Sequence, residues 1–246
     1  MGMKKKLILL ATVTLAVLTA CQSGKNTAKT KLAEDEQVFT WWADRSKPFG
    51  NLEYLEISEK EATELMANKF ELKIPRFFDV AKEIIEDDLV SDAVQREPDI
   101  YNVVASGNDL VLSSLIKIKD AKGSYLSYGK IELKYQYMGL QKKVKLLSQE
   151  VSIYNLSEDE TYHGKDATAV LKQLSSLMKL KDQDKLLTKF TEETKESQNN
   201  VGKEISLYRT LDKAYKNNSF GKNLVVTFNG AGGIKIIEAA ISDYRL

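Results

Sequence analysis

The chain contains a single cysteine and a single histidine among 246 residues. One cysteine excludes an intramolecular disulfide, so a folded domain of this length must be held by its hydrophobic core. Zinc chemistry is disfavoured, since structural zinc sites usually combine Cys with His and catalytic ones need two or three His. A Ser-His-Asp arrangement would have to use His163. Because His163 lies in the polar stretch ETYHGKD, we interpret it as a solvated loop residue.

An excess of charge of one sign is also absent. The 36 basic side chains are matched by 35 acidic ones, which gives a net charge of +1. A chain that binds nucleic acid is expected to carry a clear basic excess. We therefore predict no nucleic-acid partner.

The apolar run near the N-terminus is too short for a comfortable membrane span. It covers Leu7 to Ala20, about 14 residues or roughly 21 Å as a helix, whereas a bilayer core is about 30 Å thick. Three lysines, at positions 4–6, precede this run, and small residues end it. A basic start, a short apolar segment and small residues are typical of a secretory signal peptide. We predict that residues 1–20 are such a signal.

The end of this run carries a more specific motif. Leu18-Thr19-Ala20-Cys21 resembles the lipobox of bacterial lipoproteins, and the resemblance covers only residues 1–21. It implies that a diacylglycerol is attached to the Cys21 sulfur and that the chain is cut just before Cys21. Two acyl chains give a stable membrane anchor, whereas one gives marginal binding. The alternative is an ordinary signal peptide with a coincidental cysteine.

The segment after Cys21 is predicted to be a tether. Residues 22–37 are polar and charged and contain no aromatic side chain, so they bury too little apolar surface to fold. A flexible chain of this length spans roughly 20–25 Å. We therefore assign residues 21–37 as lipidated cysteine and tether. Residues 38–246 are assigned to one extracytoplasmic domain, with a possible subdivision near 155–166.

Helical spacing of apolar residues predicts several helices. A capping box of Ser58 and Glu61 opens the first, and a second ends before Pro98. Asp166 is a favourable N-cap for the apolar stripe that follows it. We also predict a later helix, on a pattern of four apolar residues: Ile205, Tyr208, Leu211 and Tyr215.

Strand patterns occupy the middle and the end of the domain. In KIELKYQY, residues 130–137, every second side chain is apolar, which is typical of an antiparallel strand with one solvated face. Residues 99–155 as a whole are predicted to form a meander, and 223–241 a hairpin around NGAGG that is able to rejoin it. Runs of like elements, rather than β–α alternation, predict an α+β fold in which helices pack on an antiparallel sheet.

Four features are candidate sites, each with a plain structural alternative. Trp41 and Trp42 point to opposite faces of an expected strand, so one ring could stack on a sugar or peptide, or both could be packing residues. The glycine-rich stretch 228–235 could cradle a phosphate, but a hairpin turn is favoured because no helix is expected after it. An acidic cluster could suggest a cation site, but we interpret it as a solvated helix face, because it does not fit an EF-hand loop. That cluster consists of Glu86, Asp87, Asp88 and Asp92.

The fourth candidate is a local imbalance of charge. Residues 53–99 hold 14 acids against 6 bases, or −8, whereas 110–146 hold 8 lysines against 2 acids, or +6. The basic segment could meet an anionic envelope polymer or lipid head groups. Alternatively, the two segments neutralise one another across the fold.

We hypothesise a non-enzymatic protein, lipid-anchored at Cys21 on the extracytoplasmic side of the cell membrane, that binds a ligand or an envelope partner. No catalytic, cofactor-binding or metal-binding residue is assigned. The lysine-rich tether and the lack of disulfides resemble Gram-positive lipoproteins. One alternative is a carboxylate-dependent hydrolase of envelope glycans, which needs two carboxylates about 5–10 Å apart in a deep cleft. Another is a precursor that releases residues 14–20 as a signalling peptide.

Overall fold

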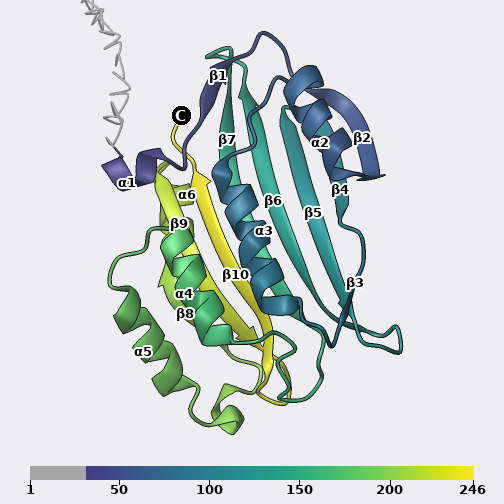
Figure 1. Cartoon of the computed structure of the whole chain (residues 1–246). Helices are drawn as coiled ribbons and strands as arrows, with labels where there is room; N and C mark the ends of the chain where they lie inside the picture. Colours follow the sequence, from purple (N-terminus) through teal and green to yellow (C-terminus); the bar gives the residue numbers. More distant parts are fainter. Residues whose placement is uncertain (1–31) are drawn as a thin grey trace, which may run out of the picture. The chain divides into compact units, whose positions relative to one another are not determined.

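An antiparallel sheet of ten strands forms the frame of the molecule (Figure 1). The computed structural model describes residues 32–246, so the predicted signal, Cys21 and residues 22–31 lie outside the described residues. The main strand order is β2-β4-β5-β6-β7-β10-β9-β8, with β1 paired to β7 and β3 to β5. The strands are β1 (Trp42–Asp44), β2 (Gly50–Ile57), β3 (Gln95–Arg96), β4 (Ile100–Gly107), β5 (Asp109–Lys119), β6 (Tyr125–Met138), β7 (Lys143–Asn155), β8 (Glu204–Arg209), β9 (Phe220–Phe228) and β10 (Ile234–Asp243).

The longer helices lie on one face of this sheet, with α3 and α4 side by side across it (Figure 1). In the part of the chain from residue 32 onward, no helix is long and apolar enough to cross a membrane. The described residues form one compact unit. The helical elements are α1 (Glu34–Gln37), α2 (Glu59–Glu64), the π-helix η1 (Leu65–Lys69), α3 (Arg76–Leu89), α4 (Ala167–Leu177), α5 (Gln183–Glu193), the 3₁₀ helix η2 (Ser197–Asn200) and α6 (Leu211–Lys216).

The short helix α6 packs on the opposite face. Gly221 of β9 pairs with Ser242, which pairs with Ser148, so the three positions share that face. A Cβ atom at Gly221 would lie 2.5 Å from the Ala214 Cβ of α6, so only glycine allows the helix to sit there. Among residues 32–246, no other helix packs on this face, and we call the remainder of it the open face.

The predicted α+β class is confirmed, and so is the alternation in β6. Ile131, Leu133, Tyr135 and Tyr137 are buried against the helical layer, while the intervening side chains reach the open face. Burial of a large apolar side chain stabilises the folded state by about 1.5–3 kcal/mol. These four side chains therefore contribute to the core that stabilises this fold without disulfides. The C-terminal hairpin also rejoins the sheet as predicted, because β10 pairs with β7.

Both predicted helix starts are confirmed. The Ser58 hydroxyl accepts from the backbone N–H of Glu61, and the Glu61 carboxylate accepts from the backbone N–H of Ser58 at 2.9 Å. Asp166 accepts from the backbone N–H groups of Thr168 and Ala169, which opens α4. These bonds satisfy N–H groups that have no partner within the helix.

The predicted helix through Ile205 and Tyr215 is wrong. Ile205 and Tyr208 lie on strand β8, which pairs with β9, and only Leu211 and Tyr215 are helical, in α6. In β8, Ile205 and Leu207 are both buried, with period two. Spacings of three and four residues across the strand–helix junction imitated one amphipathic helix.

The predicted tether also extends too far. Residues 32–37 are ordered against the body: Leu32 is only 9% exposed and α1 follows it at once. The Gln37 side chain donates to the Leu32 carbonyl oxygen at 3.4 Å. The folded part therefore begins by residue 32, six residues before Val38.

Candidate functional site

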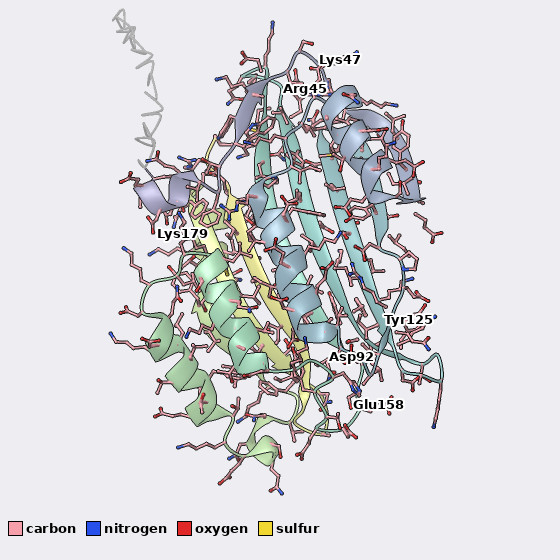
Figure 2. The ribbon with its side chains drawn as sticks, viewed as in Figure 1. Arg45, Lys47, Asp92, Tyr125, Glu158 and Lys179 are labelled. Atoms are coloured by element: carbon pink, nitrogen blue, oxygen red, sulfur yellow. The ribbon has the colours of Figure 1, made fainter. Side chains whose placement is uncertain are left out.

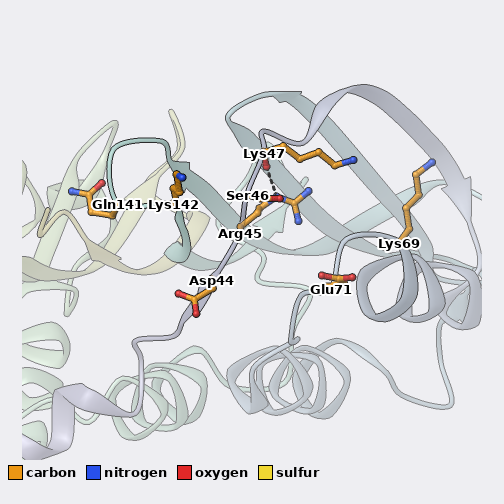
Figure 3. Close-up of a pocket in the computed structure, with 8 residues that line it drawn as sticks. All are labelled: Asp44, Arg45, Ser46, Lys47, Lys69, Glu71, Gln141 and Lys142. Atoms are coloured by element: carbon orange, nitrogen blue, oxygen red, sulfur yellow. Dashed lines mark hydrogen bonds between the residues drawn. The ribbon is translucent and has the colours of Figure 1, made fainter.

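A cleft of about 620 Å³ opens at one end of the sheet (Figure 3). Three segments that are distant in sequence form it: the connection from β1 to β2, the end of η1, and the turn from β6 to β7. The lining residues are Asp44, Arg45, Ser46, Lys47, Lys69, Glu71, Gln141 and Lys142.

Strand pairing brings these segments together. Asp44 pairs with Lys143 across β1 and β7, and the Arg45 backbone N–H donates to the Lys142 carbonyl at 2.9 Å. The Tyr137 hydroxyl, from the buried side of β6, donates to the Ser46 carbonyl at 3.2 Å. Phe49 is buried just beyond, where it closes the β1–β2 connection onto the core.

Arg45 is held in a fixed orientation at the centre of the cleft. Its Nε donates to the Lys47 carbonyl and its Nη1 to the Phe70 carbonyl, both at 2.9 Å. The guanidinium carbon lies 4.2 Å from the centroid of the Phe49 ring, a cation–π contact. Burial lowers the pKa of Arg45, and the Glu71 carboxylate opposes that shift. An arginine stays charged under such a shift, so the cleft holds a positioned, permanent cation.

Three lysines, Lys47, Lys69 and Lys142, add positive charge around Arg45. Lys47 and Lys142 are exposed and form no ion pair within residues 32–246. Lys69 donates to the Tyr54 hydroxyl and lies 4.9 Å from the centre of that ring. With Asp44 and Glu71 as the only carboxylates in the lining, four cations face two anions. The cleft is therefore suited to an anionic group.

Lys69 also borders a second, less polar hollow of about 430 Å³. Its apolar lining comes from Tyr54, Ile57 and Leu65, between β2 and the helical segment. Lys69, the last residue of the π-helix η1, lines both this hollow and the cleft. Single π-turns occur frequently at functional sites, so this position adds weight to the candidate site.

The two tryptophans lie elsewhere. Trp41 packs against the core with its ring edge-to-face on Tyr135, at 6.1 Å between centroids. Trp42 lies beside Lys145, whose Nζ is 5.3 Å from the indole centre. Both side chains are half-buried, and neither lines the cleft. These contacts favour the packing interpretation.

The glycine-rich stretch 228–235 is the predicted hairpin turn between β9 and β10. The Asn229 side-chain carbonyl accepts from the backbone N–H groups of Ala231 and Gly233 at 2.9 Å, which closes the turn. Gly232 adopts a φ of +87° and lies against the Ser197 carbonyl. Because a strand rather than a helix follows, no helix N-terminus is present to hold a phosphate.

The acidic cluster is only partly the solvated helix face that we predicted. Asp88 is 5% exposed, and its carboxylate accepts from the Tyr162 hydroxyl at 2.5 Å and from two backbone N–H groups of residues 165 and 166. The prediction failed because the loop after β7 folds back over this side of α3. Glu86 pairs with Arg96 at 2.7 Å. Within residues 32–246, no group of three or more Asp, Glu, His or Cys is placed to hold a metal ion.

The basic segment 110–146 does not form a basic face. Lys117 and Lys119 pair with Glu97, Lys130 pairs with Glu132, and Lys134 pairs with Asp109. Lys145 is buried and donates to the Arg245 carbonyl at 2.6 Å. Only the pairs with Glu97 join the two charged segments, because Glu132 and Asp109 lie outside 53–99. Pairing with nearby acids therefore removes most of the predicted basic surface. Of the eight lysines, Lys142 is the one that lines the cleft.

The open face carries a row of carboxylates. Glu132 pairs in register with Glu150, and Glu238 lies nearby on β10, opposite Ser152. Burial, with the charges of Glu238 and Glu132, raises the pKa of Glu150. None of these three residues lines the cleft or the apolar hollow. The row therefore gives no support to the hydrolase alternative, which requires a cleft.

His163 is in a loop, as predicted, and its backbone N–H donates to the Asn155 side chain at 3.0 Å.

Comparison with known proteins adds no further constraint: no family model, curated protein or solved structure matches the chain. The geometry of the cleft and the N-terminal motif are therefore the features from which a function can be inferred.

Proposed function

We propose that this chain is a non-enzymatic lipoprotein, anchored through Cys21 on the extracytoplasmic side of a bacterial membrane, that binds an anionic group of an envelope component. The observation that carries the binding proposal is the cleft around Arg45, with its excess of cations. The lipobox resemblance of residues 18–21 supports the anchor. Together they describe a receptor-like body held beside the polymers and head groups of the envelope.

The chemistry of the cleft favours phosphate or carboxylate groups. A fixed guanidinium provides directional N–H donors, while the flexible ammonium groups of Lys47 and Lys142 act as point charges that adapt to the ligand. A volume of about 620 Å³ lies within the usual range of roughly 300–1,000 Å³ for small-ligand sites. The lining is predominantly polar, so the bound portion of the ligand is expected to be hydrophilic.

Titration of the purified mature protein with a fluorescent glycerol-phosphate oligomer tests the binding proposal. A neutral dextran of similar length serves as the ligand control. Replacing Lys47 and Lys142 together by Gln removes two charges, each of which contributes about 0.2–1 kcal/mol in an exposed pair. We expect affinity for the oligomer to fall about two- to thirtyfold, which corresponds to a total of about 0.4–2 kcal/mol.

Lys122→Gln is the matched control variant. Lys122 is exposed and lies in the turn between β5 and β6, outside the cleft, so its removal lowers the net charge without changing the site. Equal losses in the control and the cleft variants, or equal binding of dextran, would contradict a specific anion site.

The anchor is tested separately, in cells supplied with labelled fatty acid. We expect the native chain to incorporate the label and Cys21→Ser to remain as an unlabelled, uncleaved precursor. Normal labelling and processing of Cys21→Ser would refute lipid attachment at this residue. This result does not depend on the cleft, so the two parts of the proposal can fail independently.

A further inference from the structure

The turn between β6 and β7 exposes an apolar side chain completely. Leu140 is 100% exposed, more than any other large apolar side chain of residues 32–246. Backbone hydrogen bonds from Gln141 to Met138 at 3.1 Å and from Lys142 to Gly139 at 3.3 Å shape the turn. Two long paired strands support it. Leu140 therefore contributes no burial to the core, and it is the charge around it that points to a binding role.

Positive charge surrounds this leucine. Lys142 and Lys143 come two and three positions after it, both exposed, and neither forms an ion pair within the described residues. Lys47 and Arg45, labelled in Figure 2, border the same turn, because they line the cleft together with Gln141 and Lys142. With Lys69 and Lys143, five cations lie in or beside the cleft, whose lining contains two carboxylates, Asp44 and Glu71. An exposed apolar side chain beside clustered lysines is the arrangement that binds an anionic lipid interface.

We propose that the β6–β7 turn inserts Leu140 into the interface of an anionic membrane and so forms a second membrane contact of the lipid-anchored protein. This inference rests on the anchor part of the proposed function. The contact directs the Arg45 cleft toward the bilayer surface, where anionic head groups are concentrated. Lys142 and Lys143 remain at the head-group level, since their ammonium groups are attracted to anionic lipid.

The chain can reach this arrangement. Eleven residue steps separate Cys21 from Leu32, which allows at most about 36–40 Å between an anchor at Cys21 and the start of the body. From there, residues 32–44 lead to β1, and Asp44 pairs with Lys143 at the start of β7. The end of β1, twelve residues after Leu32, therefore lies beside the turn that carries Leu140.

A fluorescent probe on the turn tests the inference. The mature protein has only Cys21, whose sulfur is occupied by lipid, so Leu140→Cys introduces the only free thiol for an environment-sensitive dye. The labelled, natively lipidated protein is reconstituted into phosphatidylcholine vesicles with or without phosphatidylglycerol. We expect blue-shifted, intensified emission with phosphatidylglycerol, and quenching by lipids brominated on the acyl chain.

Val201→Cys is the control position. Val201 is also an exposed apolar residue, but it lies at the opposite end of the sheet, where Gly202 bonds to Asn229 in the β9–β10 turn. Its dye is expected to remain in water. Replacing Lys142 and Lys143 by Gln should lower the ratio of inserted to free turn about 25-fold, at about fivefold for each lysine.

The remaining outcomes separate the hypotheses. If the dye at position 140 behaves like that at position 201 while fatty-acid labelling is normal, the second contact is wrong and the anchor stands. If fatty-acid labelling fails, the anchor is wrong. Leu140→Cys is then combined with Cys21→Ser, so that position 140 again carries the only thiol, and its emission shift with added vesicles decides for or against the turn. A shift with whole envelope fractions, but not with lipid vesicles, overturns the proposal in favour of a protein partner.

Discussion

Replacing Asp88 by Ala should destabilise the protein strongly, although Asp88 belongs to an acidic run on a helix. The buried carboxylate accepts from the Tyr162 hydroxyl at 2.5 Å and from the Asp166 backbone N–H at 3.1 Å. Neither donor has another acceptor within residues 32–246. The Lys165 backbone N–H, which also donates to this carboxylate, would still donate to the backbone carbonyl oxygen of residue 88 after the substitution. Two hydrogen bonds to a charged group, at about 1.5–3 kcal/mol each, predict a loss of about 3 kcal/mol or more.

A loss of that size is a large share of the roughly 5–15 kcal/mol that stabilises a typical domain. Asp88→Asn keeps one acceptor oxygen for the backbone donor, so we expect it to cost only about 1 kcal/mol. Urea unfolding followed by tryptophan fluorescence measures both variants. The slope of the free energy with urea should stay constant, since the core is unchanged.

Asp87→Ala supplies the matched control, because Asp87 is exposed and its side chain takes part in no hydrogen bond of the described residues. Its effect should stay within about 0.5 kcal/mol. If Asp88→Ala is as stable as Asp87→Ala, the carboxylate does not hold the loop, and our account of this contact is wrong.

Three further predictions concern the sheet and the cleft. Because the pKa of Glu150 is raised, the folded state binds the proton of this carboxyl more tightly than the unfolded state, and the contribution of Glu150 to stability falls as pH rises from about 4 through the folded pKa. Glu150→Gln should therefore raise the urea midpoint more at pH 8 than at pH 4. Equal shifts of the midpoint at the two pH values would contradict this prediction. Lys142 has a φ of +50°, so Lys142→Gly should keep stability within about 1 kcal/mol while it weakens anion binding, as calorimetry and urea unfolding of the same sample can show. Tyr135→Phe removes a buried hydroxyl that donates to the Lys73 carbonyl at 2.7 Å and should cost about 1 kcal/mol; an unchanged midpoint would show that this bond contributes nothing.

The parts of the fold that follow local rules could be predicted from the sequence. Strict alternation in 130–137 and the N-caps at Ser58 and Asp166 each depend on a few adjacent residues. Where the structure depends on contacts between residues distant in the sequence, predictions from local patterns failed. The burial of Asp88 depends on a loop about 75 residues away in the sequence. Leu32 is buried although the residues around it are polar, so the local sequence gives no sign of its packing.

The candidate site was missed for the same reason. Its cations come from residues 45–47, 69 and 142, none of which lies in a motif or a periodic pattern. Their association depends on the pairing of β1 with β7 and on the position of η1. The imbalance of charge in 110–146 did include Lys142, but the signal was diluted by lysines that pair with neighbouring acids.

Strand β2 ends the sheet on one side, and its pairing with β4 is irregular between Tyr54 and Ile57. Glu56, at this break, adopts a left-handed backbone conformation with a φ of +54°, and Glu53 adds charge to the strand. Bulges and charges on a border strand hinder the addition of a further strand from another molecule. Molecules confined to the plane of a membrane, as a lipid anchor would confine them, meet their neighbours far more often than in solution. This irregular border would then keep crowded copies from joining into continuous sheets.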